Sequence, residues 1–168
     1  MNRREIWIHK FKLIFLYNNN SDSKFEDIFY TYILNLPYET EEDNNSYLSN
    51  QKNNFTKIYK DIDSENILID EDDNERELFI FFKNFIDLSS QIDEKIKNSI
   101  LDYDIDRLNK IDLALLRLAT YEIYYDNNTE YKLAINEVID ISKVYSEEKS
   151  PKFINGVISS IMNKYPIL

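Results

Sequence analysis

The single glycine of this chain, Gly156, is the feature that most restricts the folds open to it. Tight β-turns and phosphate-binding loops need glycine at several positions. One Gly and three Pro in 168 residues therefore argue against an all-β chain and exclude glycine-rich nucleotide-binding fingerprints. Long runs of Leu, Ile, Lys, Glu and Asn instead favour helices joined by short polar loops, and 43% hydrophobic residues suffice for a sizeable core. The sequence predicts an all-α fold.

The stretch around this glycine has the pattern of a helix. Ser150 is a good N-cap, and Pro151 suits the first helical position. Apolar residues follow at helical spacing: Phe153, Ile154, Val157, Ile158 and Ile161. Gly156 then lies inside the helix, where it costs about 1 kcal/mol relative to Ala. Its expected role is to let this helix pack closely against the helix of 110–125 or the first helix; close approach of a ligand is the alternative.

Apolar periodicity predicts the other helices along the chain. They are expected at about 2–17, 24–36, 75–88, 92–101, 110–125 and 131–145, with a break at Ser89-Ser90-Gln91 and a short helix around 55–62. The 110–125 helix is apolar nearly all round, so it should be buried on most sides, with Arg117 in a structural ion pair. No apolar run approaches the roughly 20 residues of a membrane span, which predicts a cytoplasmic protein.

Charge is distributed unevenly along the chain. The formal net charge of −11 argues against a generally nucleic-acid-binding surface. However, the segment 38–77 holds 13 acidic and 4 basic residues, whereas the first twelve residues hold four Lys or Arg and one Glu. We expect a single domain, 1–168, with a basic N-terminus and an acidic insert at about 38–77 whose order the sequence leaves open. A local basic patch can still bind phosphate, because charges beyond about 8 Å are largely screened.

The chemistry available points to binding rather than catalysis. There is no Cys, and His9 is the only histidine, so thiolate sites, multi-histidine metal sites and a nucleophile–base pair cannot be assembled. No catalytic residue, metal or cofactor is expected. Lys152 and Phe153 at the start of a helix could offer a phosphate partner and a stacking face, and stacking contributes about 1–3 kcal/mol per base. Arg3 and Arg4 could hold neighbouring phosphates if the first helix packs nearby.

Three segments carry a family resemblance. They are 111–123 (IDLALLRLATYEI), 133–138 (LAINEV) and 150–157 (SPKFINGV). In order and spacing they resemble a central helix, an Ala-Ile-Asn-Glu signature and a Lys-Phe-x-Asn-Gly signature of the NusB family of bacterial transcription antitermination factors. The resemblance extends from about Glu75 to Met162, and is weaker before that.

The resemblance implies a NusB-like bundle of about seven helices in two small three-helix subdomains. It implies a non-enzymatic factor that binds boxA RNA of ribosomal RNA operons together with NusE, a small-subunit ribosomal protein, and promotes processive rRNA transcription by the elongation complex. The RNA-binding residues it implies are Arg3, Arg4, Lys149, Lys152 and Phe153, and those facing NusE are Phe15 and Asp112. No membrane partner is implied. Monomer and homodimer both stay open, since some such proteins dimerise over the RNA-binding surface.

Two departures from the family pattern leave alternatives open. Trp7 stands where the N-terminal motif usually has another basic residue, and Lys149 stands where an acidic residue is common. Losing one phosphate contact lowers the salt dependence of single-strand binding by a slope of about 0.7. A helical protein-interaction module with weakened or lost RNA binding is therefore the alternative. Similar domains also occur in ribosomal RNA cytosine methyltransferases, but without a glycine-rich cofactor domain here, methyl transfer is not expected.

Overall fold

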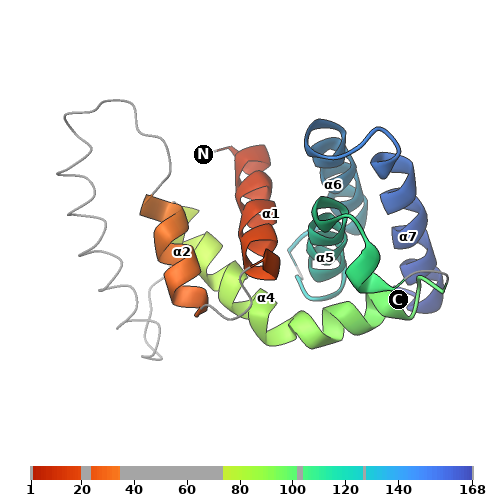
Figure 1. Ribbon diagram of the computed structural model, residues 1–168, viewed down its shortest axis with the longest axis horizontal. Helices are drawn as coiled ribbons and strands as arrows, with labels where there is room; N and C mark the ends of the chain where they lie inside the picture. The colour runs from red at the N-terminus through yellow and green to blue at the C-terminus, as the bar shows by residue number, and fades with distance from the viewer. Residues whose placement is uncertain (1, 20–23, 35–73, 102–103, 127, 168) are drawn as a thin grey trace.

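The computed structural model describes residues 2–19, 24–34, 74–101, 104–126 and 128–167 (Figure 1). These residues form six α-helices and one 3-10 turn, η1, and no strand: α1 (Arg3–Asn19), α2 (Phe25–Leu34), α4 (Asn74–Lys97), η1 (Ile105–Arg107), α5 (Lys110–Tyr124), α6 (Tyr131–Tyr145) and α7 (Ser150–Lys164). The all-α prediction is confirmed. The short helix expected around 55–62, and the acidic insert as far as residue 73, lie outside the described residues.

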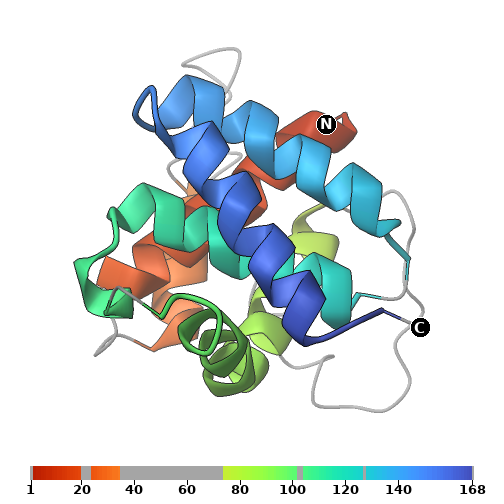
Figure 2. The ribbon, with the colours of Figure 1, turned by 90° about the vertical axis from the view of Figure 1, so that its right-hand side faces the viewer.

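The described helices pack as two groups of three. α1, α2 and α4 contact one another, as do α5, α6 and α7, and the groups meet where α5 packs against α1 and α4. In Figure 1, α5 and α6 stand between α1 and α7. Figure 2, turned by 90°, shows α7 crossing in front of α5, with α6 alongside. This matches the expected division into two three-helix halves.

The break expected at Ser89-Ser90-Gln91 is wrong, because α4 continues through it as one helix of 24 residues. Phe85, Ile92 and Ile96 keep the apolar stripe on one face, and each is 1% exposed or less. Serine disfavours a helix by only a few tenths of a kcal/mol. Burying isoleucine side chains contributes about 1.5–3 kcal/mol each, so packing outweighs the local preference.

The core is centred on α5, whose side chains are buried nearly all round. Leu115, Leu116 and Leu118 are fully buried, as the apolar pattern predicts. Aromatic rings of α4 pack beside them; Phe81 meets Tyr121 edge to face, with ring centroids 4.9 Å apart. Arg117 makes the expected ion pair, with two bonds of 2.7 and 2.9 Å to Asp93 of α4. A bidentate pair of this kind fixes α5 against α4.

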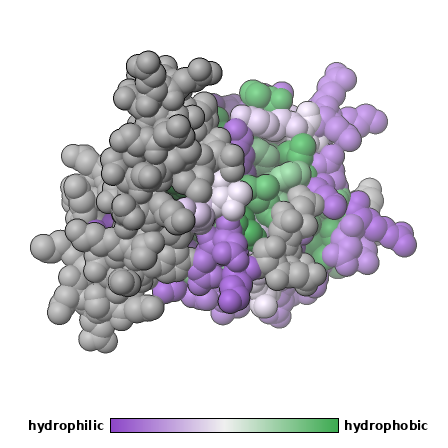
Figure 3. All heavy atoms as spheres, turned by 60° about the vertical axis from the view of Figure 1, so that its left-hand side comes forward, coloured by the Kyte–Doolittle hydropathy of each residue, from purple (hydrophilic) through white to green (hydrophobic). Residues whose placement is uncertain are grey.

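The surface is chemically mixed despite the high charge of the chain. On the face shown in Figure 3, apolar residues gather beside hydrophilic ones rather than being scattered evenly. No described helix is long and apolar enough to cross a membrane. The residues of each surface patch, rather than the net charge of the chain, therefore indicate which ligands that patch could bind.

Candidate nucleic-acid interface

The beginning of α7 is held in place by a buried carboxylate. Asp112, in the first turn of α5, is 6% exposed and accepts hydrogen bonds from the hydroxyls of Ser146 and Ser150, the latter at 3.0 Å. The two serine hydroxyls are also 2.8 Å apart. This cluster ties the end of α6 and the start of α7 to α5. The N-cap prediction for Ser150 is wrong: Lys149 is the N-cap, and Ser150 is helical and buried.

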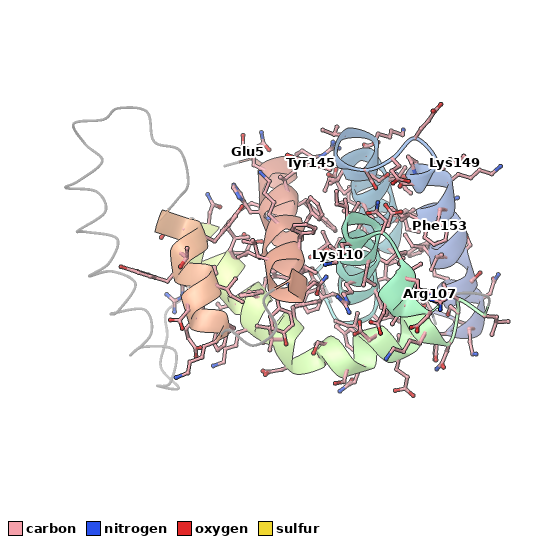
Figure 4. The ribbon with its side chains drawn as sticks, viewed as in Figure 1. Glu5, Arg107, Lys110, Tyr145, Lys149 and Phe153 are labelled. Carbon is pink, nitrogen blue, oxygen red and sulfur yellow. The ribbon has the colours of Figure 1, made fainter. Side chains whose placement is uncertain are left out.

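Three of the expected RNA-binding residues lie on this fixed helix start. Lys149 and Lys152 are exposed, whereas Phe153 is partly buried and packs against the core. Figure 4 places Lys149 at the first turn of α7 and Phe153 one turn further along. Two cations and an aromatic ring therefore lie within five residues at the start of α7. Such a set can attract phosphates and support a stacked base.

A groove of about 280 Å³ runs beside Phe153, between α7 and the residues that follow α4. Its walls come from the end of the α4 segment and from one face of α7: Ser99, Ile100, Leu101, Lys152, Phe153, Gly156, Val157 and Ser160. Leu101 is 89% exposed. Gly156 is also exposed, and a Cβ added there would meet no atom within 4 Å. The prediction that Gly156 allows close helix packing is therefore wrong.

The two N-terminal arginines lie elsewhere and are paired with carboxylates. One nitrogen of Arg3 lies 2.9 and 3.2 Å from the two carboxylate oxygens of Glu77 in α4. Arg4 donates to Glu137 at 3.1 Å and to Asp140 at 3.0 Å, both in α6. These bonds raise the pKa of Arg4, the largest contribution coming from its hydrogen bond with Glu137. An RNA phosphate would have to compete with these carboxylates for either guanidinium.

The five expected RNA-binding residues therefore fall into two sets. Arg3 and Arg4 begin α1, while Lys149, Lys152 and Phe153 begin α7 on the other side of α5 and α6 (Figure 1). Trp7, which replaces the usual basic residue, is 3% exposed and belongs to the core. In this arrangement both arginines donate hydrogen bonds to carboxylates of the same molecule, Arg3 to α4 and Arg4 to α6. The α7 set is the better-formed candidate for a phosphate and base contact.

The two residues expected to face a protein partner differ in accessibility. Phe15 is partly buried on α1, and its ring centroid lies 6.4 Å from that of Phe11. Asp112 directs its carboxylate to Ser146 and Ser150 inside the molecule. A carboxylate that is 6% exposed and already accepts two hydrogen bonds has little capacity left for a partner. This geometry favours a positioning role for Asp112.

Two cations near this region were missed by the sequence reasoning. Arg107 in η1 and Lys110 at the start of α5 are exposed, and Figure 4 shows both in the half of the molecule formed by α5, α6 and α7. Asn109 between them donates to Glu147 at 3.3 Å, which places this turn beside the α6–α7 connection. In the sequence, the only indication of this pair was that the two cations lie close to the start of one helix. The turn's position beside α7 comes from the tertiary fold.

A buried ion pair lies beneath α1, away from the α7 surface. Lys10 donates to Glu122 at 2.9 Å, and Thr129 donates to the other oxygen of Glu122 at 3.2 Å. Glu122 has no exposed surface; burial, and then a hydrogen bond with Asp126, raise its pKa to about 7 against the opposing effect of Lys10. The pair joins α1 to α5, and its buried position makes it a structural element.

The only histidine is partly buried. His9 forms a hydrogen bond with the hydroxyl of Tyr32 in α2, and burial lowers the His9 pKa. Among the described residues no group of three or more His, Asp or Glu side chains could hold a metal ion.

Comparison with known proteins identifies the family. A family model described as the NusB family matches residues 11–163. The Listeria innocua protein named Transcription antitermination protein NusB is 44% identical over 96 residues, covering 57% of this chain and 73% of that protein. A Clostridium botulinum protein of the same name is 47% identical over 73 residues, covering 44% of this chain and 55% of that protein.

The fold agrees with this assignment. A solved structure of T. maritima NusB superimposes with a TM-score of 0.68 at 22% identity, covering 99% of this chain and 94% of that one. The family model spans most of the sequence, including the helices that carry the α7 surface and the Asp112 cluster. The chain belongs to the NusB family.

Proposed function

We propose that this chain is a transcription antitermination factor that binds boxA RNA of ribosomal RNA operons together with NusE and so promotes processive rRNA transcription. The antitermination part is supported by relatives named Transcription antitermination protein NusB. The boxA and NusE parts rest on the resemblance of the signature segments. The chain acts by assembly in this proposal, holding RNA and a ribosomal protein together for the elongation complex.

The observation that carries the RNA half is the surface at the start of α7. Lys149, Lys152 and Phe153 lie within two turns of one helix, and the Asp112 cluster fixes that helix start against α5. A surface that is already fixed loses little conformational entropy when RNA binds. More of the free energy of each contact therefore contributes to the binding affinity. The lysines supply sequence-independent attraction, while Phe153 offers a face to a base of single-stranded RNA.

The direct test is a salt titration of a boxA-like RNA, with and without NusE. Lys152→Ala is expected to reduce the steepness of log affinity against log salt by about 0.7, because one phosphate contact on a single strand is lost. Phe153→Ala is expected to weaken binding by about 1–3 kcal/mol, roughly 5- to 150-fold, with little change in that slope. Fluorescence anisotropy of labelled RNA measures both quantities.

Lys132→Ala is the matched control, since it also removes one lysine charge. Lys132 is exposed at the beginning of α6, whereas α7 follows the end of α6. This variant is expected to leave the salt slope unchanged. Binding that shows no preference for boxA over a scrambled RNA, with or without NusE, would remove the RNA half of the proposal.

One observation favours the second candidate, a protein-interaction module with weakened RNA binding. Arg4 is engaged by Glu137 and Asp140, so these carboxylates compete with any phosphate. If Arg4 is an RNA contact, the double variant Glu137→Gln/Asp140→Asn is expected to tighten RNA binding several-fold by releasing the guanidinium. Anisotropy at a single low salt concentration is enough to see this change.

Removing any two acids makes the chain less repulsive to RNA, so the comparison needs a variant of equal charge. Asp87→Asn/Glu94→Gln removes two exposed carboxylates of α4 and provides it. Equal gains in the two double variants would mean that Arg4 does not contact RNA. NusE binding that persists while neither double variant affects RNA would favour the protein-interaction module.

A further inference from the structure

The only glycine of the chain sits where the fold itself gives no reason for one. Gly156 lies in the middle of α7 without a positive φ, so no special backbone conformation requires it. A Cβ at this position would meet nothing within 4 Å, so helix packing does not require it either. A helix-interior glycine nevertheless destabilises a helix relative to alanine. Because Gly156 has no side chain, the groove that it lines stays open.

The chemistry of this groove is unusual for so acidic a chain. Lys152 is the one charged residue among the described residues that line it, and no carboxylate is among them. Phe153 supplies an aromatic wall, while Leu101 and Val157 add apolar surface. A separate pocket of about 320 Å³, lined by residues of α1, α4 and α5 and by residues after α5, instead includes Glu77 and Asp126 in its lining. Of the two, the groove on α7 is the one suited to an anionic ligand.

The size and shape of the groove restrict the occupant further. At about 280 Å³ it falls just below the usual range of ligand pockets, roughly 300 to 1,000 Å³, so its occupant is small. Its lining comes from two short stretches, 99–101 and 152–160, so it fits a single planar ring better than a helix or strand of another protein. A planar ring that carries a phosphate suits both the apolar walls and the lysine. A nucleotide unit of single-stranded RNA has this combination.

We propose that the groove is a subsite for one unstacked base of bound RNA, with the base lying over the bare backbone of Gly156, against Phe153 and Leu101, and its phosphate near Lys152. This inference rests on the proposed function and adds to it a specific place for one base. Gly156 then contributes by the space it leaves, and a side chain at this position would occupy the place of the ring.

The test separates folding from binding. Gly156→Ala is expected to raise the urea midpoint of unfolding, since alanine is the better helix former, while lowering RNA affinity a few-fold. Gly156→Leu is expected to lower RNA affinity at least tenfold without loss of helical circular dichroism. Ser159→Leu is the control, because it adds the same side chain at an exposed position of α7 that does not line the groove. It is expected to bind RNA as the unaltered chain does.

A set of boxA-like RNAs, each with one abasic nucleotide, locates the base. The unaltered chain is expected to lose affinity most strongly at one position, and Gly156→Leu is expected to be insensitive at that same position. Unchanged affinity of Gly156→Leu, in a chain that binds RNA, would overturn the subsite alone. Weaker NusE binding by Gly156→Leu without RNA would assign the groove to protein and also overturn it. No RNA binding by the unaltered chain, with or without NusE, would overturn the proposed function itself.

Discussion

Lys10→Met is expected to lower the free energy of unfolding by about 3–5 kcal/mol near pH 8. The substitution leaves Glu122, which has no exposed surface, as a buried carboxylate without its cation. Methionine keeps most of the apolar stem of the lysine, but the contacts of the Lys10 ammonium with the rings of Trp7 and Phe81 are lost with the charge. Urea unfolding followed by circular dichroism measures the loss. Lys12→Met on the same helix is the control; it removes a contact of the ammonium with the Tyr145 ring but leaves no buried charge, and should lower stability by about 1 kcal/mol or less.

The loss should be smaller at pH 5 than at pH 8. Burial raises the pKa of Glu122 to about 7 from its usual 4.5, so the folded chain binds this proton more tightly than the unfolded chain does. The contribution of Glu122 to stability is therefore greatest below about pH 4.5 and declines as the pH rises towards 7. Removing Lys10 takes away an interaction that lowers this pKa, which extends the decline to higher pH.

A second substitution makes the explanation testable. Lys10→Met/Glu122→Gln has no buried charge at this place, while the amide can still accept from Thr129. It should recover much of the lost stability at pH 8 and abolish the extra pH dependence. A single variant, Lys10→Met, that is equally destabilised at both pH values would show that lost packing, rather than the bare carboxylate, is responsible.

Asp112→Ala is expected to lower the free energy of unfolding by about 2–3 kcal/mol. The hydroxyls of the partly buried Ser146 and of the buried Ser150 would lose a charged acceptor, and bonds to charged groups contribute about 1.5–3 kcal/mol. Asp112→Asn should cost less, because its amide oxygen can still accept. RNA affinity should fall with Asp112→Ala at temperatures where the chain remains folded, since Lys152 and Phe153 would lose their fixed support.

A double-mutant cycle with Ser150→Ala measures the interaction directly. We expect a coupling of about 1 kcal/mol or more between positions 112 and 150, because each removes the partner of the other. Unchanged stability of Asp112→Ala, accompanied by weaker NusE binding, would instead support Asp112 as a partner contact.

Local pattern was enough to predict much of the fold. α6 was expected at 131–145 and is Tyr131–Tyr145, and the first helical residue of α7, expected at Pro151, lies one residue earlier at Ser150. In both helices the apolar spacing and the polar flanking residues agree with the tertiary packing. The break predicted in α4 failed because Ile92 and Ile96 are buried by the fold, which local propensity does not register.

The candidate site was predictable only in part. Lys152 and Phe153 could be named because they are adjacent to each other and lie in a signature segment. The pairing of Arg4 with Glu137 joins residues far apart in the chain, and no spacing rule indicates it. The true setting of Gly156 depends on what lies opposite α7, so the expected close packing could be rejected only with the tertiary structure.

The length of α4 has a structural consequence. With 24 residues it extends about 36 Å, from its contact with α2 to its contact with α7. Ser99, Ile100 and Leu101, one wall of the α7 groove, follow directly from its last turn. One continuous helix therefore links the aromatic contacts of Phe79 with Phe25 and Phe29 of α2, in one half of the molecule, to the wall of the α7 groove in the other.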